Sequence, residues 1–309
     1  MSFDFSTQLG DKRFSNPIFT ASGCAGSGKE LAQFFALEEL GGIVTKSIMM
    51  KPRSGRATPR MAETPSGMLN SIGLQGPGID RFLADDIPWL KSQNATIVIS
   101  IAGESVEDYG LLAKKLDGIP GISAIEINIS CPNVENRGQV FSCHVDTAYA
   151  AVNAVKTNLN LRIPLIAKLS PDVTNIADIA ESVHSAGASG VALINTLLGM
   201  VIDTNTMKPK LAGKTGGLSG PAIRPVAVRA IYQVHQRLPQ LSILGMGGVA
   251  SGRDALELIL AGASGISVGT ATFGNPLAAI KVKNELQDLL IEKGFASVAA
   301  AVGFAHRDS

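Results

Sequence analysis

One cysteine follows a strand-like run in the segment EINISCPNVENRGQ, residues 126–139. Ile127 and Ile129 alternate with polar residues, which is the period-two pattern of a β-strand, and Cys131 stands where that strand would end. A lone cysteine is ordinarily a small buried hydrophobe. A thiol between amides at a strand end can also serve chemistry, so the residues at other strand ends must decide between the two.

Two lysines occupy comparable positions. Lys46 lies near the end of the apolar run 42–47, and Lys168 lies near the end of the run 164–170. Such a lysine can form a Schiff base, remain charged to stabilise an anion, or only pair with a neighbouring carboxylate. Histidines and carboxylates are missing from most of the strand ends, and Glu126 lies inside its strand.

Eight short apolar runs must position these residues. Segments with helical periodicity separate most of them, such as 174–188 and 251–263, where Ser251 and Asp254 form a capping-box pattern. Alternating strands and helices indicate parallel βαβ units, and eight of them predict a single (β/α)8 TIM barrel domain over residues 1–309. The runs are residues 17–22, 42–47, 96–102, 124–130, 164–170, 190–196, 242–248 and 265–271.

Two connections are longer than a simple crossover requires, after the second strand at 48–95 and after the sixth at 197–241. Loops of this length are usually functional, and in a barrel the loops after the strands form the active site. The N-terminal segment at 3–17 predicts a hairpin that turns at 9–11 and covers the bottom of the barrel.

The last two strands end in Gly247-Gly248 and Gly269-Thr270. Glycine lets backbone N–H groups approach a ligand, and a following helix favours an anion at its N-terminus. These positions therefore predict a phosphate site, the alternative being tight turns alone. Two lysines, several amides, a thiol and a phosphate site suit an anionic, amide-containing substrate beside a phosphate-bearing cofactor.

Composition argues against several other classes of protein. The net charge is +1, which offers no electrostatic reason for a nucleic-acid or membrane partner. The N-terminus lacks the pattern of a signal peptide, and no apolar run approaches a membrane span. The 3 cysteines and 4 histidines lack the spacing of a metal site, so no metal and a reducing, cytoplasmic setting are expected.

A set of motifs resembles those of class 1 dihydroorotate dehydrogenases, over nearly the whole chain and in the family's order. The motifs IGLQGPG and TGGLSGPAI are more similar to the B-type catalytic subunit, which works with a separate electron-transfer subunit, than to the fumarate-linked A-type. The motifs are TKS (45–47), MLNSIGLQGPG (68–78), NISCPN (128–133), INT (194–196), TGGLSGPAI (215–223) and GMGG (245–248).

The resemblance implies an enzyme that binds flavin mononucleotide (FMN) and oxidises (S)-dihydroorotate to orotate in pyrimidine biosynthesis. A base removes a proton from carbon five while a hydride passes from carbon six to FMN, and Cys131 matches that base. The chain has too few cysteines for an iron–sulfur cluster of its own and no GxGxxG fingerprint after a strand. The resemblance therefore implies a partner subunit with FAD and an iron–sulfur cluster that passes electrons to NAD⁺, with this chain a homodimer within a heterotetramer.

The resemblance also implies which residues form the site. Lys46 matches a residue that touches both flavin and substrate, and Lys168 matches a cation that stabilises the reduced flavin at its pyrimidine edge. The positions that match substrate contacts are Asn70, the backbone of Ser71, Ile72, Gly73 and Leu74, and the side chains of Asn128, Asn133, Asn195 and Thr196. The remaining positions that match flavin contacts are Ser22, Ser47, Asn128, Ile194, Gly220, Gly247, Gly248, Gly269 and Thr270.

Ser100 departs from the family pattern, because B-type enzymes usually have asparagine there. Its side chain offers one hydroxyl in place of an amide, so Ser100 is a cofactor-site candidate whose direct contact with FMN is open. Cys24 and Cys143 are expected to be structural or incidental.

Other functions stay open at this point. An A-type enzyme or a dihydropyrimidine dehydrogenase-like subunit would keep the flavin chemistry but change the acceptor or the pyrimidine. A flavin-free lyase with Lys46 or Lys168 as a Schiff base would belong to another class, and an inactive barrel could serve as a scaffold. A yellow protein that bleaches anaerobically with dihydroorotate would exclude the last two.

Overall fold

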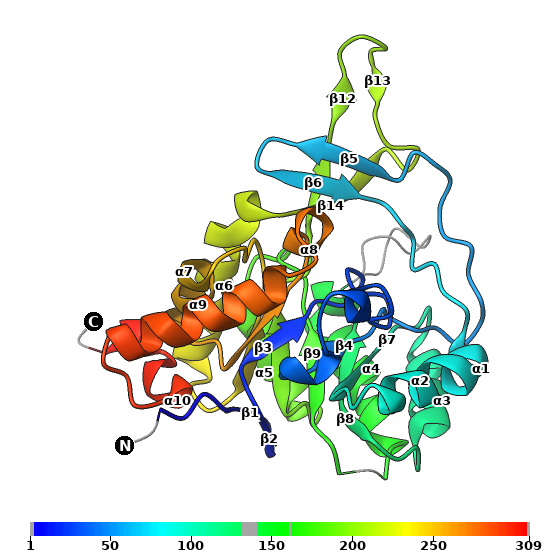
Figure 1. The fold of residues 1–309 in the computed structure, drawn as a ribbon. Coiled ribbons are helices and arrows are strands. Elements are labelled where there is room, and N and C mark those ends of the chain that lie inside the picture. The colour runs from blue at the N-terminus through cyan, green and yellow to red at the C-terminus, as the bar shows by residue number, and fades with distance from the viewer. Residues whose placement is uncertain (1–2, 131–140, 161, 308–309) are drawn as a thin grey trace.

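The strands of the central sheet run in chain order around a barrel (Figure 1). The computed structural model describes residues 3–130, 141–160 and 162–307. The eight predicted strands are confirmed, and they pair in parallel in the order β3-β16-β15-β10-β9-β8-β7-β4. The ring closes between β3 and β4, where the N–H of Val44 donates to Thr20 Oγ1 at 2.8 Å. The strands are β3 (Ile18–Thr20), β4 (Ile43–Val44), β7 (Ile97–Ile101), β8 (Ile122–Asn128), β9 (Leu165–Lys168), β10 (Gly190–Leu193), β15 (Ser242–Gly245) and β16 (Gly265–Val268).

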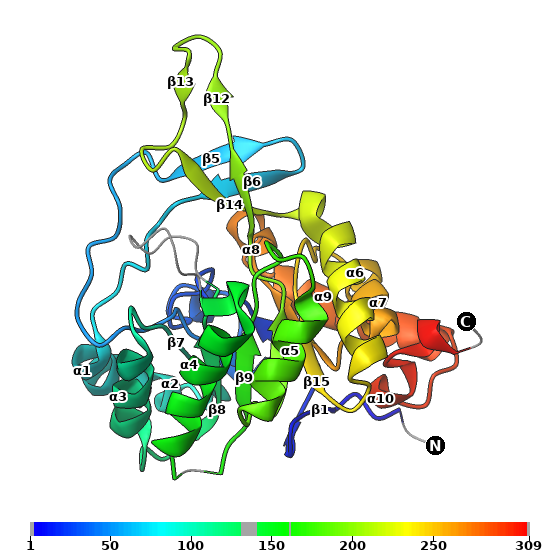
Figure 2. The same cartoon turned by 180° about the vertical axis from the view of Figure 1, so that it is seen from behind.

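Helices cover the outside of the barrel (Figures 1 and 2). The capping box of Ser251 and Asp254 is confirmed at the start of α7, and Ser105 with Asp108 forms a second one at α3. The helices are α1 (Ile79–Arg81), α2 (Ile87–Ser92), α3 (Val106–Leu116), α4 (Val145–Thr157), α5 (Ile176–Ser185), α6 (Arg224–Arg237), α7 (Gly252–Ala261), α8 (Ala271–Gly274), α9 (Ala278–Glu292) and α10 (Val298–Ala301). Short 3₁₀ turns lie at Leu31–Gln33, Leu37–Glu39, Phe141–Cys143, Pro221–Ile223 and Phe304–His306, and a π turn at Phe82–Asp86.

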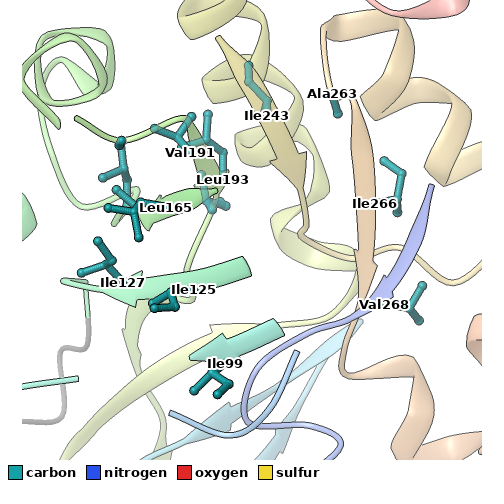
Figure 3. Packing of buried hydrophobic residues seen from close by; sticks show 14 of the residues in the cluster. Ile99, Ile125, Ile127, Leu165, Val191, Leu193, Ile243, Ala263, Ile266 and Val268 are labelled. Atoms are coloured by element: carbon teal, nitrogen blue, oxygen red, sulfur yellow. The ribbon is translucent and has the colours of Figure 1, made fainter. Parts of the chain in front are cut away.

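Side chains alternate along the strands between the helix layer and the barrel interior. Outward residues such as Ile99, Ile125 and Leu165 belong to the large core between strands and helices, part of which Figure 3 shows. Inward residues such as Val98 and Ile166 form a separate apolar cluster. Each layer therefore receives every second residue of a strand.

The N-terminal hairpin covers the bottom of the barrel, as predicted. It consists of β1 (Thr7–Leu9) and β2 (Lys12–Phe14), and Gly10 makes the turn with a φ of +61°. Leu9 and Phe14 are buried in the same cluster as the inward apolar residues of the barrel strands. The hairpin thus completes the inner core.

The inward positions become polar two residues further along three neighbouring strands. Val98 is followed by Ser100 on β7, and Ile166 is followed by Lys168 on β9. On β8 the inward position after Ala124 is Glu126, and all three polar residues are buried. Because parallel strands end at the same side of a barrel, these groups gather at its C-terminal mouth.

The two long connections pair with each other across this mouth, which the sequence did not predict. The first supplies β5 (Met61–Thr64) and β6 (Gly67–Asn70), and the second supplies β11 (Leu197–Met200) and β14 (Thr215–Ser219). They form an antiparallel sheet in the order β11-β14-β6-β5. The hairpin of β12 (Ile202–Asp203) and β13 (Lys208–Pro209) projects beyond it (Figures 1 and 2).

Among the helices of the described ranges, none combines the length and the apolar character that crossing a membrane would require.

Candidate active site

A cavity of about 600 Å³ lies between the strand ends and the antiparallel sheet of the long connections. Most of the predicted site residues line it, although they come from segments far apart in the sequence. These are Ser22, Lys46, Ser47, Asn70, Ile72, Gly73, Leu74, Asn128, Lys168, Ile194, Asn195, Thr196, Gly220, Gly247, Gly248, Gly269 and Thr270. The barrel therefore brings the lysines, the amides and the glycines into one place.

Two predicted residues, Cys131 and Asn133, lie outside the described residues.

Ser71 and Ser100, expected at the site through the backbone of Ser71 and with the FMN contact of Ser100 left open, are not among the residues that line the cavity. Ser71 is buried, its N–H donates to the oxygen of Arg60 at 2.7 Å, and its Oγ accepts from Arg56 at 3.0 Å. Its polar groups therefore hold the segment before Ile72 in place. Ser100 is fully buried, and its Oγ forms a hydrogen bond with Ser47 Oγ, which lines the cavity. Ser100 therefore supports the cavity wall from the barrel interior.

Hydrogen bonds among protein groups orient the amides of the cavity. Asn128 Nδ2 donates to Ser47 Oγ at 2.9 Å, and Asn128 Oδ1 accepts from Ser130 Oγ at 3.1 Å. Asn195 Nδ2 donates to Ser130 Oγ at 2.8 Å, while Asn195 Oδ1 accepts the N–H of Thr196 at 2.9 Å. Each amide can therefore present its remaining donor and acceptor capacity in one defined direction.

The charge of the cavity wall is positive. Among the described lining residues, Lys46 and Lys168 are the cations and no carboxylate is present. Lys168 Nζ donates to Ser22 Oγ at 2.9 Å and lies 3.8 Å from Glu126 Oε2, which is behind the wall. An ammonium held in an ion pair is a poor nucleophile, so this geometry favours anion stabilisation over a Schiff base at Lys168.

The glycines at the end of β15 bring two backbones together. Gly247 and Gly248 have φ angles of +135° and +72°, and a Cβ on Gly248 would lie 2.7 Å from the oxygen of Gly220. Among the described residues, the N–H groups of Gly248 and Gly269 have no hydrogen-bond acceptor. N–H groups without an acceptor beside such a turn suit a phosphate, so the residues present fit a phosphate-bearing cofactor.

Sequence reasoning missed several lining residues, of which Cys24 is chemically the most distinctive. Burial raises the pKa of its thiol, and the charges of Lys168 and Lys46 oppose that rise. Its position in the sequence could have indicated this, because Cys24 lies shortly after the end of β3, as the predicted site residues lie at the ends of their own strands. Cys143 lies elsewhere, in an open pocket beside Asp172, where burial raises the pKa of its thiol.

Comparison with known proteins agrees with this architecture. A profile of the family described as dihydroorotate dehydrogenase matches residues 5–290. A protein of Desulforudis audaxviator is 48% identical over 292 residues, which cover 94% of this chain and 94% of that protein. Relatives from Desulforamulus reducens and Bacillus cytotoxicus are 46% and 47% identical, covering 99% and 93% of this chain and 100% and 92% of their own lengths. All three are named catalytic subunits of dihydroorotate dehydrogenase B (NAD⁺). Since the matches span nearly the whole chain at this identity, the chain belongs to the dihydroorotate dehydrogenase family.

Proposed function

We propose that this chain binds FMN and oxidises (S)-dihydroorotate to orotate in pyrimidine biosynthesis, as the catalytic subunit of an enzyme that passes electrons to NAD⁺. The observation that carries the proposal is the single cavity in which two lysines, oriented amides and a glycine turn meet. The names of the relatives supply the substrate and the acceptor.

The amides suit the pyrimidine ring of the substrate. That ring presents alternating amide donors and acceptors, which require amide or hydroxyl partners. Asn128, Asn195 and Thr196 line the cavity together and are oriented by protein hydrogen bonds. Lys46 and Asn70 also line the cavity, and we place the substrate carboxylate beside them.

The remaining lining residues would hold the cofactor. We place its phosphate at the backbone of Gly247, Gly248 and Gly269, and its ring system beside Lys168 and Ser22. When bound, FMN supplies the acceptor for the hydride from carbon six of dihydroorotate. Lys168 would stabilise the negative charge that arrives with the electrons.

Cys131 remains our proposed base for the proton on carbon five. The supporting observation is that the residue before it, Ser130, contacts the cavity wall. Ser130 Oγ accepts from Asn195 Nδ2 at 2.8 Å, and Asn195 lines the cavity. A thiolate can remove a proton near neutral pH, whereas a serine hydroxyl in its place would need an activating group.

We further propose that residues 1–309 act as one FMN domain and that a second subunit carries FAD and an iron–sulfur cluster. The motif that would bind a dinucleotide, GxGxxG after a strand, is absent from this sequence. The relatives' names also describe a catalytic subunit, which implies another subunit beside it.

Anaerobic addition of dihydroorotate to the purified chain tests the proposal. We expect a yellow protein that contains FMN, bleaches with dihydroorotate and yields orotate. NAD⁺ should be reduced only after the second subunit is added, so acceptor assays with NAD⁺, fumarate and quinone complete the test. A protein that binds no flavin, or one that is not bleached by dihydroorotate, would refute the proposed function.

A further inference from the structure

Glu126 is a buried carboxylate for which the proposed function has no use. Its side chain is fully buried inside the barrel, behind the wall of the cavity. Oε1 accepts from Ser100 Oγ at 2.8 Å, whereas Oε2 has no hydrogen bond among the described residues and lies 3.8 Å from Lys168 Nζ. Burying a carboxylate costs free energy unless it is paired, so its partners should reveal its role.

The register of the sheet explains these contacts. Ser100 on β7 pairs directly with Glu126 on β8, so their inward side chains are neighbours. Lys168 on β9 pairs with Asn128, two residues beyond Glu126, so Lys168 is a diagonal neighbour of the carboxylate. The ammonium therefore lies between Glu126 on its buried side and Ser22 on the cavity side.

Glu126 also ends a chain of hydrogen bonds that runs in one direction. A carboxylate only accepts, so Ser100 must donate to Glu126, and Ser47 must then donate to Ser100 Oγ at 2.8 Å. The hydroxyl of Ser47 in turn accepts from Asn128 Nδ2 at 2.9 Å.

The same direction continues to the second amide. The backbone N–H of Ser130 can only donate, and it points at Asn128 Oδ1 at 3.3 Å, which confirms the orientation of that amide. Ser130 Oγ also donates to this oxygen and accepts from Asn195 Nδ2. Every bond from Asn195 to Ser100 therefore points toward Glu126.

We propose that Glu126 is a positioning residue with two separable actions on the site. Its negative charge balances Lys168, and its oxygen is the final acceptor that orients the amides of Asn128 and Asn195. The two tests below that measure flavin potential and orotate affinity rest on the proposed function. The pairing of Glu126 with Lys168 is a property of the chain itself and is tested without either ligand.

Three variants separate the two actions in the holoenzyme. Glu126→Gln removes the charge but keeps an acceptor oxygen, Ser100→Ala cuts the chain but keeps the ion pair, and Glu126→Leu removes both. Glu126→Asp keeps both groups and is the conservative rescue. Glu181→Gln is the matched control, because Glu181 pairs with Arg237 at 2.8 Å on the surface.

The flavin midpoint potential reports on the charge. Without Glu126 the Lys168 charge is unbalanced and favours the reduced flavin. We expect Glu126→Gln to raise the ratio of reduced-state to oxidised-state flavin affinity about tenfold, which is a rise of about 30 mV for two electrons. Ser100→Ala, Glu126→Asp and Glu181→Gln should stay near the wild-type potential. An unchanged or lower potential in Glu126→Gln would overturn the balancing charge.

Orotate affinity reports on the hydrogen-bond chain. The loss of one acceptor should weaken orotate binding by about threefold to tenfold in Ser100→Ala and in Glu126→Leu, which is the range of a single hydrogen bond. Glu126→Gln should bind orotate as the wild type does. Equal orotate affinity in Ser100→Ala and the wild type would refute the orienting action.

A third measurement needs no flavin. Urea unfolding of the full chain without FMN is compared for Glu126→Gln, Lys168→Met and the double variant. Each single change leaves a buried polar or charged group unmatched, so the double variant should lose less stability than the sum. Additive losses would refute the pairing. If the wild type binds no FMN, the proposed function fails while this cycle still decides the pairing.

Discussion

The bottom and the mouth of the barrel use the same strands in opposite ways. At the bottom, inward residues such as Val98 and Ile166 pack with Leu9 and Phe14 of the hairpin. At the mouth, two residues further along the same strands, the inward residues are Ser100 and Lys168. Both sets are buried, so burial alone does not distinguish a core from a site. The distinction comes from whether the strand end opens onto a cavity.

This comparison teaches that one barrel can separate stability from chemistry along its axis. Changes at the bottom should alter the free energy of unfolding and leave the reaction intact. Changes at the mouth should mainly alter the reaction, since its polar groups add little apolar burial. Only a change that leaves a buried charge such as Glu126 or Lys168 unpaired should also lower the free energy of unfolding. The following predictions test that separation, from the largest expected effect to the smallest.

The largest effect is expected at the proposed base. Cys131→Ala and Cys131→Ser should reduce the rate of flavin reduction by dihydroorotate about 10²–10⁴-fold, because loss of a positioned base has that effect. Bound FMN and orotate affinity should persist. Stopped-flow bleaching measures the rate, and a value within a fewfold of the wild type in Cys131→Ala would remove this residue as the base.

At the bottom, Phe14→Ala should reverse this pattern. Phe14 is buried and meets the ring of Phe19 edge-on, with centroids 5.2 Å apart. Its truncation should lower the free energy of unfolding by about 3–5 kcal/mol, measured by urea unfolding. Flavin reduction in the folded fraction should stay near wild type. A large loss of rate at full folding would show that the bottom and the mouth are coupled.

Gly248→Ala should weaken FMN binding about tenfold or more. The new Cβ would meet the Gly220 oxygen at 2.7 Å and displace the turn, which typically costs about 1–3 kcal/mol. Gly118→Ala is the matched control, because Gly118 has a similar φ of +78° and no atom within 4 Å of a Cβ. Fluorescence titration with FMN compares the two, and equal affinities would argue against a phosphate site at this turn.

The smallest effect concerns pH and lies away from the cavity. Burial and the nearby His306 lower the pKa of His235 below its ordinary 6.5, and His235 Nδ1 is buried without a hydrogen bond in the described part of the chain. Below a pH of about 6.5, the unfolded chain therefore binds more protons than the folded chain. The free energy of unfolding should therefore be highest above that pH, with His235 neutral, and should fall as the pH decreases below it.

The variant His235→Gln tests this prediction. Its free energy of unfolding should depend less on pH between about 7 and 5 than that of the wild type, because the titrating group is gone. Urea unfolding at several pH values gives the slopes. Identical slopes would place the pH dependence in other groups.

Much of the fold could be predicted because its signals are local. Each barrel strand is a short apolar run, the capping box at Ser251 and Asp254 is read from four adjacent residues, and the hairpin turn requires Gly10 at a positive φ. The match to the family then indicated which strand-end residues gather in the cavity. Most of them do line it.

The exceptions show what local signals omit. The family pattern placed the backbone of Ser71 at the site and left the contact of Ser100 open. Neither residue lines the cavity, and their hydroxyls bond Arg56 and Glu126. Cys24 was expected to be incidental, yet it lines the cavity. For the two serines, the direction of the side chain depends on a hydrogen-bond partner outside the local sequence pattern.

The sequence by itself determined the alternation of strands and helices, the inward and outward faces of each strand and the residue types at the strand ends. These follow from periodicity and from backbone preferences within a few residues. Only the tertiary structure decided that the two long connections form one sheet over the mouth, where Gly217 pairs with Asn70. It also decided that Lys168 meets Ser22 across 146 residues of chain and that Glu126 lies behind it. Such contacts depend on register and closure of the whole barrel, because a hydrogen bond or an ion pair needs its two atoms within a few ångströms.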